Sequence, residues 1–289
     1  MERTVRTRDG LALLRRDWPS ADARGTIVIV HGLGEHIGRY VHVAARLNAA
    51  RWSVVGCDQR GHGASPGERG RIAAGDDLLA DLAAVIDEIR AETGGPLVLL
   101  GHSLGGLVVA RFVAGALESP KPAPAWQREV DALVLSSPAL DIGMTAARRA
   151  LLATLETLTP NLGIGNGLDA SAISRDPAVV AAYRADPLVH DRIAPRLVRF
   201  LADAGPAVCA LAPRWRVPTL LLYAGSDRCV VPAGSAAFAA AAPASVVTAH
   251  AFEPLFHEIF NEPEQDEVLR ILTAWLDTLN LSPMTRSPR

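Results

Sequence analysis

The sequence predicts an α/β fold, with a mostly parallel central sheet and helices on both faces. Short runs of β-branched and leucine residues recur along the chain, and longer segments with helical spacing separate most of them. Runs that are apolar at every position are typical of strands buried on both faces. Their alternation with helices indicates parallel pairing, because parallel neighbours need a long crossover connection that a helix usually provides.

The expected elements follow this scheme along the chain. Strands are expected first at 4–7 and 11–16, where Asp9-Gly10 favours a hairpin turn and therefore an antiparallel edge. The strands expected to pair in parallel occupy 26–30, 53–57, 97–100, 132–135, 219–223 and 245–248. The expected helices occupy 40–50, 76–92, 104–117, 235–242 and 264–279.

The interval 141–216 breaks the alternation. It holds no clear strand and six prolines, and it is too long for a structureless loop in a compact domain. We expect a helical cap inserted into one core formed by 1–140 and 217–281, followed by a flexible tail at 282–289.

Four leucines of this interval share one face of an expected helix. They are Leu151, Leu152, Leu155 and Leu158, preceded by Arg148 and Arg149. Such a face either packs the cap onto the core, or lines an entrance for an acyl chain and touches lipid. Both interpretations stay open, and transient contact with a membrane surface is therefore a hypothesis.

Composition excludes several classes of protein. Apolar residues make up 49% of the chain and charged residues 21%, which excludes a disordered chain, and a net charge of −2 argues against nucleic acid as a partner. The three cysteines form no C-x-x-C motif, so neither a disulfide framework nor a zinc ribbon is indicated. The start of the chain lacks the apolar stretch of a secretory signal, and we expect a cytoplasmic protein. The uncharged window 229–252 contains prolines and a glycine, which favour a loop, a helix and a strand over a membrane span.

The strongest chemical signal is Gly101-His102-Ser103-Leu104-Gly105. It directly follows the expected strand at 97–100 and directly precedes a helix, which is the context of a nucleophile elbow. The turn strains the serine backbone, and glycines on either side avoid collisions of a Cβ atom with neighbouring backbone. The N-terminus of the helix places N–H groups and a partial positive charge beside the serine, where an oxyanion would develop.

A second glycine-rich turn, His31-Gly32-Leu33-Gly34, follows the expected strand at 26–30. The backbone N–H of Leu33 can complete an oxyanion hole with that of Leu104. The competing interpretation is a dinucleotide-binding loop, but the glycines at 32, 34 and 38 are spaced one residue too widely for that motif. Ser103 therefore favours the hydrolase interpretation.

A serine nucleophile needs a base and an orienting carboxylate, and α/β-hydrolases carry them in the order Ser, Asp or Glu, His. Asp227 lies just beyond the expected strand at 219–223, at the edge where a parallel sheet holds its active groups, although it also suits a turn or helix N-cap. His250 and His257 are the histidines that follow it. We favour His257, because a loop tip beyond the last strand can reach over the sheet edge.

The other histidines have no partners at metal-ligand spacing. His31 and His36 are expected to brace their loop, and His190 is expected at the surface of the cap. The segment His257-Glu258-Ile259-Phe260-Asn261 is not H-E-x-x-H, so a zinc peptidase site is not supported. We expect no metal and no organic cofactor.

Five segments together resemble the monoacylglycerol lipase and lysophospholipase family of α/β-hydrolases, over residues 8 to 279. They are 31–40 (HGLGEHIGRY), 58–65 (DQRGHGAS) with Gly67, Arg69 and Gly70, 101–106 (GHSLGG), 225–227 (GSD), and 256–258 (FHE) with Asn261 and Glu262. Within the interval 141–216, the segments 158–162, 171–175 and 186–189 are similar to the cap of monoacylglycerol lipases.

The resemblance implies an α/β-hydrolase fold and the same site that position suggests. Ser103 would be the nucleophile, Asp227 the acid and His257 the base, with Leu33 and Leu104 supplying the oxyanion N–H groups. Some relatives carry a cysteine near the acid, but Cys229 is offset by one position and receives no role from the resemblance.

The resulting prediction is a serine esterase that cleaves monoacylglycerol-type lipid esters through an acyl-enzyme. A lysophospholipase or a carboxylesterase for small or aromatic esters is the alternative on the same scaffold. A carbon–carbon hydrolase or peptidase would keep the triad, and a ligand-binding protein without activity would not need it. The sequence does not indicate acyl length, headgroup, lid motion or oligomeric state.

Overall fold

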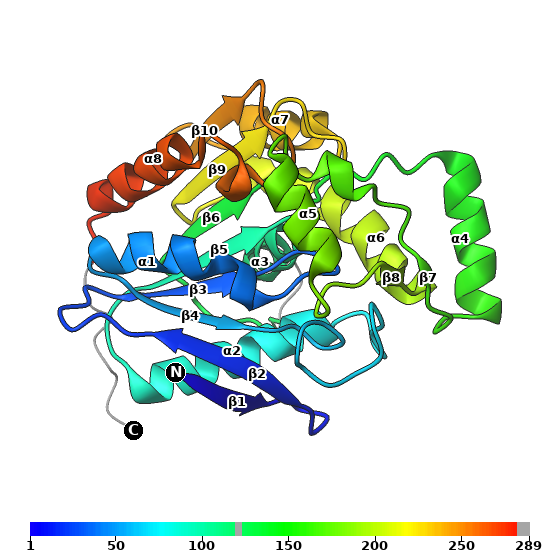
Figure 1. Ribbon diagram of the computed structural model, residues 1–289, viewed down its shortest axis with the longest axis horizontal. Helices are drawn as coiled ribbons and strands as arrows, with labels where there is room; N and C mark the ends of the chain where they lie inside the picture. Colours follow the sequence, from blue (N-terminus) through cyan, green and yellow to red (C-terminus); the bar gives the residue numbers. More distant parts are fainter. Residues whose placement is uncertain (119–122, 282–289) are drawn as a thin grey trace.

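The computed structural model describes residues 1–118 and 123–281 (Figure 1). An eight-stranded sheet runs in the order β1-β2-β4-β3-β5-β6-β9-β10. Its strands are β1 (Glu2–Arg6), β2 (Ala12–Trp18), β3 (Thr26–Val30), β4 (Ser53–Cys57), β5 (Leu97–His102), β6 (Ala132–Ser136), β9 (Thr219–Ala224) and β10 (Val247–Phe252). From β4 to β10 all neighbours pair in parallel, whereas β2 pairs antiparallel with both β1 and β4. The predicted mostly parallel sheet and its antiparallel hairpin edge are confirmed.

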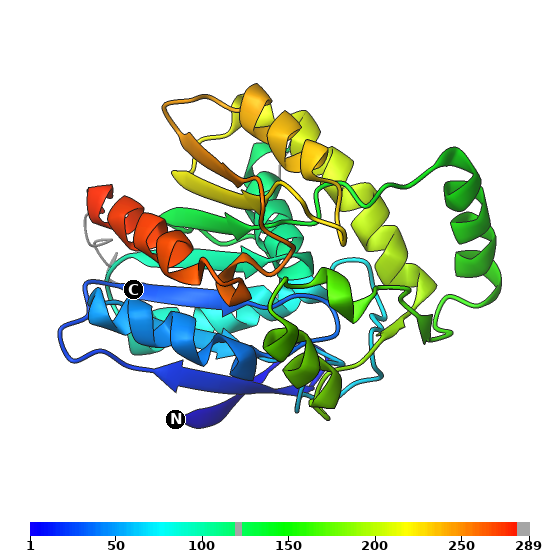
Figure 2. The same ribbon diagram turned by 45° about the horizontal axis from the view of Figure 1, so that its top comes forward.

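Helices cover both faces of this sheet (Figure 2). They are α1 (Val41–Ala49), α2 (Asp77–Glu92), α3 (Leu104–Ala114), α4 (Ala146–Leu158), α5 (Pro177–Ala185), α6 (Pro195–Leu211), α7 (Pro232–Ala241) and α8 (Gln265–Thr278). Short 3₁₀ turns are η1 (Ile37–Tyr40), η2 (Gly115–Leu117), η3 (Ala170–Ala172), η4 (Ala212–Arg214) and η5 (Ile259–Asn261).

The fold has two hydrophobic cores, one on each face of the sheet, and alternate residues of the central strand β3 belong to one or the other. In β3, Ile27 and Ile29 pack with α1 and α8, whereas Val28 and Val30 pack with α2 and α3. All five side chains of β3 are buried. Burial on both faces explains why this strand is an unbroken apolar run in the sequence.

Two predicted elements near the end of the chain are displaced. The strand predicted at 245–248 is β10, Val247–Phe252, because Pro243 accepts the turn hydrogen bonds from the N–H groups of Val246 and Val247. Most of β10 is exposed, so this edge strand lacks the apolar run that marks the central strands. The helix predicted at 235–242 begins at Pro232, which suits the first position of a helix. The window 229–252 thus contains a loop, a helix and a strand, as predicted.

The interval 141–216 adds no strand to the eight-stranded sheet. It holds α4, α5 and α6, and two short strands that pair with each other in antiparallel fashion, β7 (Ile164–Gly165) and β8 (Arg192–Ile193). The expectation of no strand here was therefore wrong, because a two-residue pairing leaves no apolar run in the sequence. Figures 1 and 2 show α4 projecting from the rest of the molecule, whereas α6 packs against α3 and α7. The tail predicted at 282–289 lies outside the described residues.

The four leucines of α4 have different environments. Leu152 is buried, whereas Leu151 and Leu158 are 59% and 73% exposed. The helix packs on α6 along one side only. The apolar face is therefore only partly covered.

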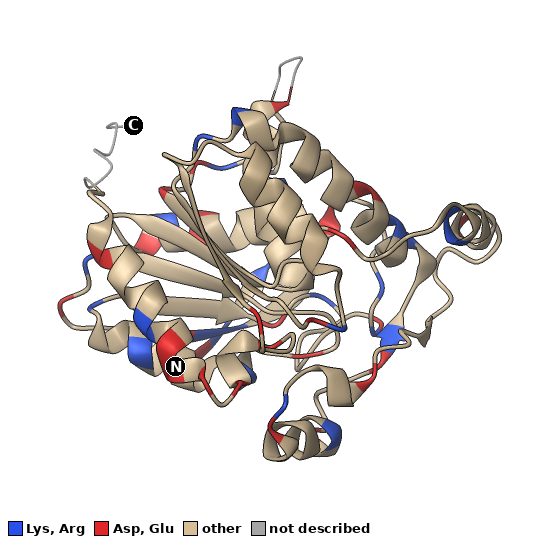
Figure 3. Cartoon of the chain, turned by 90° about the horizontal axis from the view of Figure 1, so that it is seen from above, with Lys and Arg blue, Asp and Glu red and all other residues tan. Residues whose placement is uncertain are grey.

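Charged residues of both signs are distributed over the described elements (Figure 3). The two signs are nearly balanced in number, which gives the net charge of −2. Among the described helices, none combines the length and apolar character needed to cross a membrane.

Candidate active site

Ser103 lies in the turn between β5 and α3, in a strained backbone conformation. Its φ of 54° and ψ of −117° lie outside the regions that L-residues favour. The surrounding structure holds the turn through backbone bonds, since the Ser103 N–H donates to the Ser136 carbonyl at 3.0 Å and the Ser103 carbonyl accepts from Ala139 at 3.0 Å. The neighbouring strand thus fixes a conformation that the isolated turn would not maintain.

The flanking glycines are required by close backbone contacts. A Cβ atom on Gly105 would lie 2.1 Å from the Val30 carbonyl oxygen, and one on Gly101 would lie 2.4 Å from the Gly105 carbonyl oxygen. Both separations are far below van der Waals contact. The elbow therefore depends on glycine at these positions for steric reasons.

His257 and Asp227 form a buried pair at the same end of the sheet. The Nδ1 atom of His257 lies 2.7 Å from Oδ2 of Asp227, and the two side chains are 7% and 1% exposed. The other carboxylate oxygen accepts the N–H groups of Cys229 at 2.8 Å and Val230 at 3.0 Å, so Asp227 is also the turn former that its position suggested. Donation from Nδ1 leaves Nε2 of neutral His257 as a proton acceptor.

The pair shifts both pKa values. Burial alone would lower the pKa of His257, but the Asp227 carboxylate, together with Glu258 and Glu35, outweighs burial and holds that pKa above its ordinary value. Burial alone would raise the pKa of Asp227, but its interactions with His257 hold it below the ordinary value. Each partner therefore stabilises the charged form of the other.

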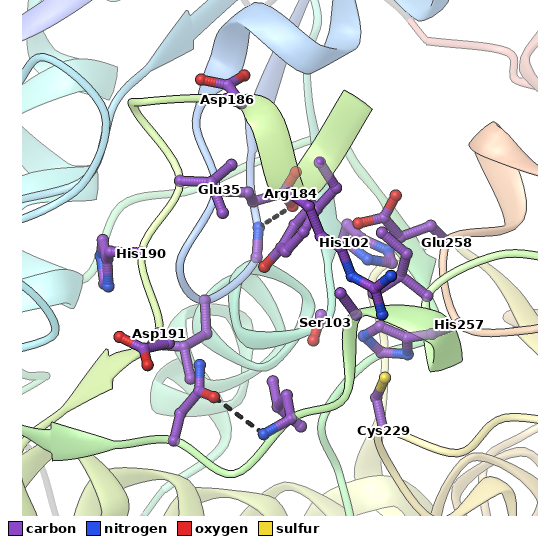
Figure 4. A pocket seen from close by; sticks show the side chains of 18 residues that line it. Glu35, His102, Ser103, Arg184, Asp186, His190, Asp191, Cys229, His257 and Glu258 are labelled. Carbon is purple, nitrogen blue, oxygen red and sulfur yellow. Dashed lines mark hydrogen bonds between the residues drawn. The ribbon is translucent and has the colours of Figure 1, made fainter. Parts of the chain in front are cut away.

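Ser103 and His257 face the same cavity, of about 330 Å³, from different loops (Figure 4). Among the described residues, no hydrogen bond joins their side chains. His250, the rival base, is an exposed residue of β10 that pairs in register with Leu222. It does not line this cavity.

The two residues predicted to supply oxyanion N–H groups lie in the turns beside Ser103. Leu33 lines the cavity in the turn after β3, and Leu104 directly follows Ser103 as the first residue of α3. In the described chain, neither N–H group has an acceptor within the turns and loops.

The cavity lies between the sheet and the interval 141–216. The sheet side contributes the catalytic candidates, and the interval contributes apolar residues that include Leu168, Ile173 and Val189. The lining also includes the charged residues Arg184, Asp186 and Asp191. The cavity therefore offers both apolar and charged surface to a ligand.

Comparisons with known proteins agree with this arrangement. The family model described as serine aminopeptidase, S33, matches residues 21–264. The chain belongs to this family. It is 37% identical to a monoacylglycerol lipase of Mycolicibacterium smegmatis, over 92% of this chain and 93% of that protein. It is 28% identical to phospholipase YtpA of Bacillus subtilis, over 90% of this chain and 98% of that protein. The crystal structure of a Paleococcus ferrophilus monoacylglycerol lipase superposes with a TM-score of 0.79 at 36% identity, covering 91% of this chain and 98% of that one.

These matches confirm the predicted family, the α/β-hydrolase fold and the class of enzyme. The S33 family member described here is an ester hydrolase.

Sequence reasoning missed a buried charge cluster in this hydrolase. Arg39 donates to both carboxylate oxygens of Glu258, at 2.6 and 2.7 Å, and to Glu35 at 2.9 Å. Glu35 in turn accepts the Gly32 N–H at 2.6 Å. The guanidinium also lies 4.8 Å from the ring of Tyr183 on α5. One side chain thus connects the glycine-rich turn after β3, the loop of His257 and the interval 141–216.

The cluster is charged despite its burial. Burial alone would raise the pKa of Glu35, but Arg39 and other neighbours hold it at about 2. A signal was present in the sequence, because Glu35, Arg39 and Glu258 all belong to the segments that carry the family resemblance. The separation of Arg39 from Glu258 along the chain concealed their contact.

The predictions for the remaining histidines are partly wrong. His31 and His36 do brace their loop: His31 Nε2 accepts the Gln59 N–H at 2.9 Å, and His36 Nδ1 accepts the Gly38 N–H at 3.2 Å. His190, expected at the surface, instead lines the cavity with its ring 4.7 Å from that of His62. Burial lowers the pKa of His190 to about 4. The prediction failed because the backbone N–H of His190 donates to the Gly34 carbonyl at 2.8 Å, which places the residue against that turn.

Proposed function

We propose that this hydrolase cleaves monoacylglycerol-type lipid esters, with Ser103 as nucleophile, His257 as base and Asp227 as the orienting acid. The observation that carries the proposal is the buried His257–Asp227 pair at 2.7 Å, on the same cavity as a serine in a strained turn. A buried charge pair is costly unless it is used or fully compensated. Its position beside the elbow supports a catalytic use.

The chemistry is a two-step acyl transfer. Nε2 of His257 accepts the Ser103 proton as the hydroxyl attacks the ester carbonyl, and the N–H groups of Leu33 and Leu104 stabilise the oxyanion. Collapse of the intermediate expels the alcohol, which takes the proton from His257, and leaves Ser103 acylated. Water then attacks the acyl-enzyme with the same proton transfers. No metal or organic cofactor takes part.

A monoacylglycerol suits the shape and polarity of the cavity. Its volume of about 330 Å³ is at the lower end for small-molecule sites, which favours one acyl chain over several. A relative at 37% identity is named a monoacylglycerol lipase, and a second is named a phospholipase. The second supports a lysophospholipase as the alternative, followed by a carboxylesterase for small or aromatic esters.

We infer that residues 141–216 act as a cap and that α4 makes transient contact with a lipid surface. The cap contributes cavity-lining residues from 166 to 191. Among the described residues, five of the seven exposed large apolar side chains lie between 151 and 168. They are Leu151, Leu158, Leu162, Ile164 and Leu168. This concentration supports lipid contact near the entrance for a lipid substrate.

The test is hydrolysis of a chain-length series of monoacylglycerols, lysophospholipids and p-nitrophenyl esters, with Ser103→Ala as the control. We expect medium or long monoacylglycerols to be preferred and the variant to lose about 10³-fold or more in rate. Preference for lysophospholipids or for the shortest esters would select one of the alternatives. Activity that survives Ser103→Ala would overturn the proposed mechanism.

A further inference from the structure

The proposed mechanism gives no role to Cys229, a possible metal ligand beside Asp227 and His257. Cys229 lines the cavity, and Figure 4 shows its sulfur facing His257. One ligand atom from each of Asp227, Cys229 and His257 lies within 4.8 Å of the other two. No other group of three such residues was found in the described part of the chain.

The three groups match the ligand preferences of zinc. A tetrahedral site with Zn–S of about 2.3 Å and Zn–N or Zn–O of about 2.0 Å separates its ligand atoms by about 3.3–3.6 Å. No two of these atoms need to approach by more than about 1.5 Å, and if the cation binds Nδ1 of His257 that atom must move about 0.6 Å away from Oδ2 of Asp227, which now lies 2.7 Å from it. Rotation of the side chains can supply movements of this size. The donor set of sulfur, nitrogen and carboxylate oxygen suits Zn²⁺ and similar thiophilic cations.

The surroundings favour a cation at this position. Two backbone N–H groups fix the Asp227 carboxylate, which is the anionic ligand. Within the described chain, the single hydrogen-bond partner of the Cys229 thiol is the Ala172 carbonyl, at a long distance of 3.8 Å. The cavity would give a cation a path from solvent to Cys229 and His257, which both line it.

We propose that Asp227, Cys229 and His257 form an inhibitory site for a thiophilic divalent cation such as Zn²⁺. On binding, the Cys229 thiol loses its proton to solvent and a metal–sulfur bond forms, with no change of oxidation state. If the cation binds Nδ1 of His257, the ring proton moves to Nε2; if it binds Nε2, it takes that lone pair directly. In both cases Nε2 can no longer accept the Ser103 proton. The inhibitory effect rests on the proposed function, whereas binding does not.

Binding can be measured without activity, with Cd²⁺ as the probe and the Ser103→Ala protein as the background. We expect Cd²⁺ to produce the ultraviolet charge-transfer absorption of a cadmium thiolate. Adding Cys229→Ser should abolish this band, and adding His257→Gln should weaken binding by at least about tenfold, because even outer-sphere partners of a metal contribute that much. The matched control is Cys209→Ser, a half-buried thiol outside the cluster, which should leave the band unchanged.

Inhibition is then measured with Zn²⁺ on active protein, each variant relative to its own rate in chelator. We expect the Zn²⁺ concentration for half-inhibition to rise at least about tenfold in Cys229→Ser and to stay unchanged in Cys209→Ser, with full recovery on adding EDTA. Equal sensitivity of native protein and Cys229→Ser would overturn the proposal, as would a cadmium band that survives Cys229→Ser or fails to form. A cadmium site in a protein that hydrolyses no ester would instead retain the site and reject the proposed function.

Discussion

The catalytic edge of the sheet and the interval 141–216 border the same cavity but are built differently. At the edge, the elbow glycines contact backbone directly, and Asp227 and His257 are almost fully buried. In the interval, α4 packs mainly on α6 and leaves Leu151 and Leu158 exposed. The groups proposed to react are therefore held by close packing on all sides, whereas α4 is held along part of its surface only.

The largest effect should follow from Asp227→Asn at the rigid edge. The amide no longer stabilises charged His257 and favours the wrong tautomer, so we expect kcat to fall by about 10⁴-fold. The control is Asp277→Asn, which removes a carboxylate from an exposed pair with Arg24. Steady-state kinetics on both variants should separate them, and similar rates would argue against the role of Asp227.

The charge cluster that joins the two regions gives the next largest effect. Arg39→Met would leave Glu35 and Glu258 buried without their partner, which we expect to cost about 3–5 kcal/mol of unfolding free energy. Arg270→Met, at an exposed pair with Glu267, should cost less than about 1 kcal/mol. Urea unfolding measures both, and equal losses would show that the cluster does not connect the regions.

A single methyl group at the elbow should have a smaller but clear effect. Gly105→Ala places its Cβ atom 2.1 Å from the Val30 carbonyl, and we expect a loss of about 1–3 kcal/mol together with lower activity. Gly75→Ala is the control, because nothing lies within 4 Å of its Cβ position. Thermal unfolding of the pair should differ; a stable, fully active Gly105→Ala protein contradicts the steric argument.

The pH dependence of stability tests the contact that His190 makes between the sheet edge and the interval 141–216. Burial lowers its pKa to about 4 from an ordinary 6.5, so the native state binds fewer protons than the unfolded state between these values. Its contribution to stability is complete above pH 6.5 and is lost as the pH falls towards 4. His190→Gln should therefore lose less stability than the native protein over this range. The exposed His250→Gln protein is the control, and parallel pH profiles for all three proteins would refute the prediction.

The smallest change in stability is expected on the exposed side of α4. The double variant Leu151→Ser, Leu158→Ser should alter the unfolding free energy by less than about 0.5 kcal/mol per site. Leu152→Ala, at the buried contact, should cost about 2 kcal/mol or more. Sedimentation with phospholipid vesicles should show weaker binding by the double variant only. Unchanged vesicle binding would leave the exposed leucines without the proposed role.

Much of the central fold could be predicted because buried parallel strands carry their own signal. The strands at 26–30 and 53–57 have the bounds expected of them, since every position is apolar or small. The edge strand β10 was misplaced because its exposed residues carry no such pattern. The β7–β8 pairing was missed because two residues per strand are too few for any periodicity.

The sequence by itself determined those of the proposed catalytic groups whose placement depends on local backbone. The elbow at Ser103 needs glycine at fixed spacing, and Asp227 follows directly from the end of β9, so both can be recognised within a few residues. Only the tertiary structure decided which distant groups meet. The contact of Arg39 with Glu258, the burial of His190 and the approach of Cys229 to His257 all join loops far apart in the chain. Such contacts are set by how the loops pack at one edge of the sheet, and neither hydrophobic period nor motif spacing encodes that packing.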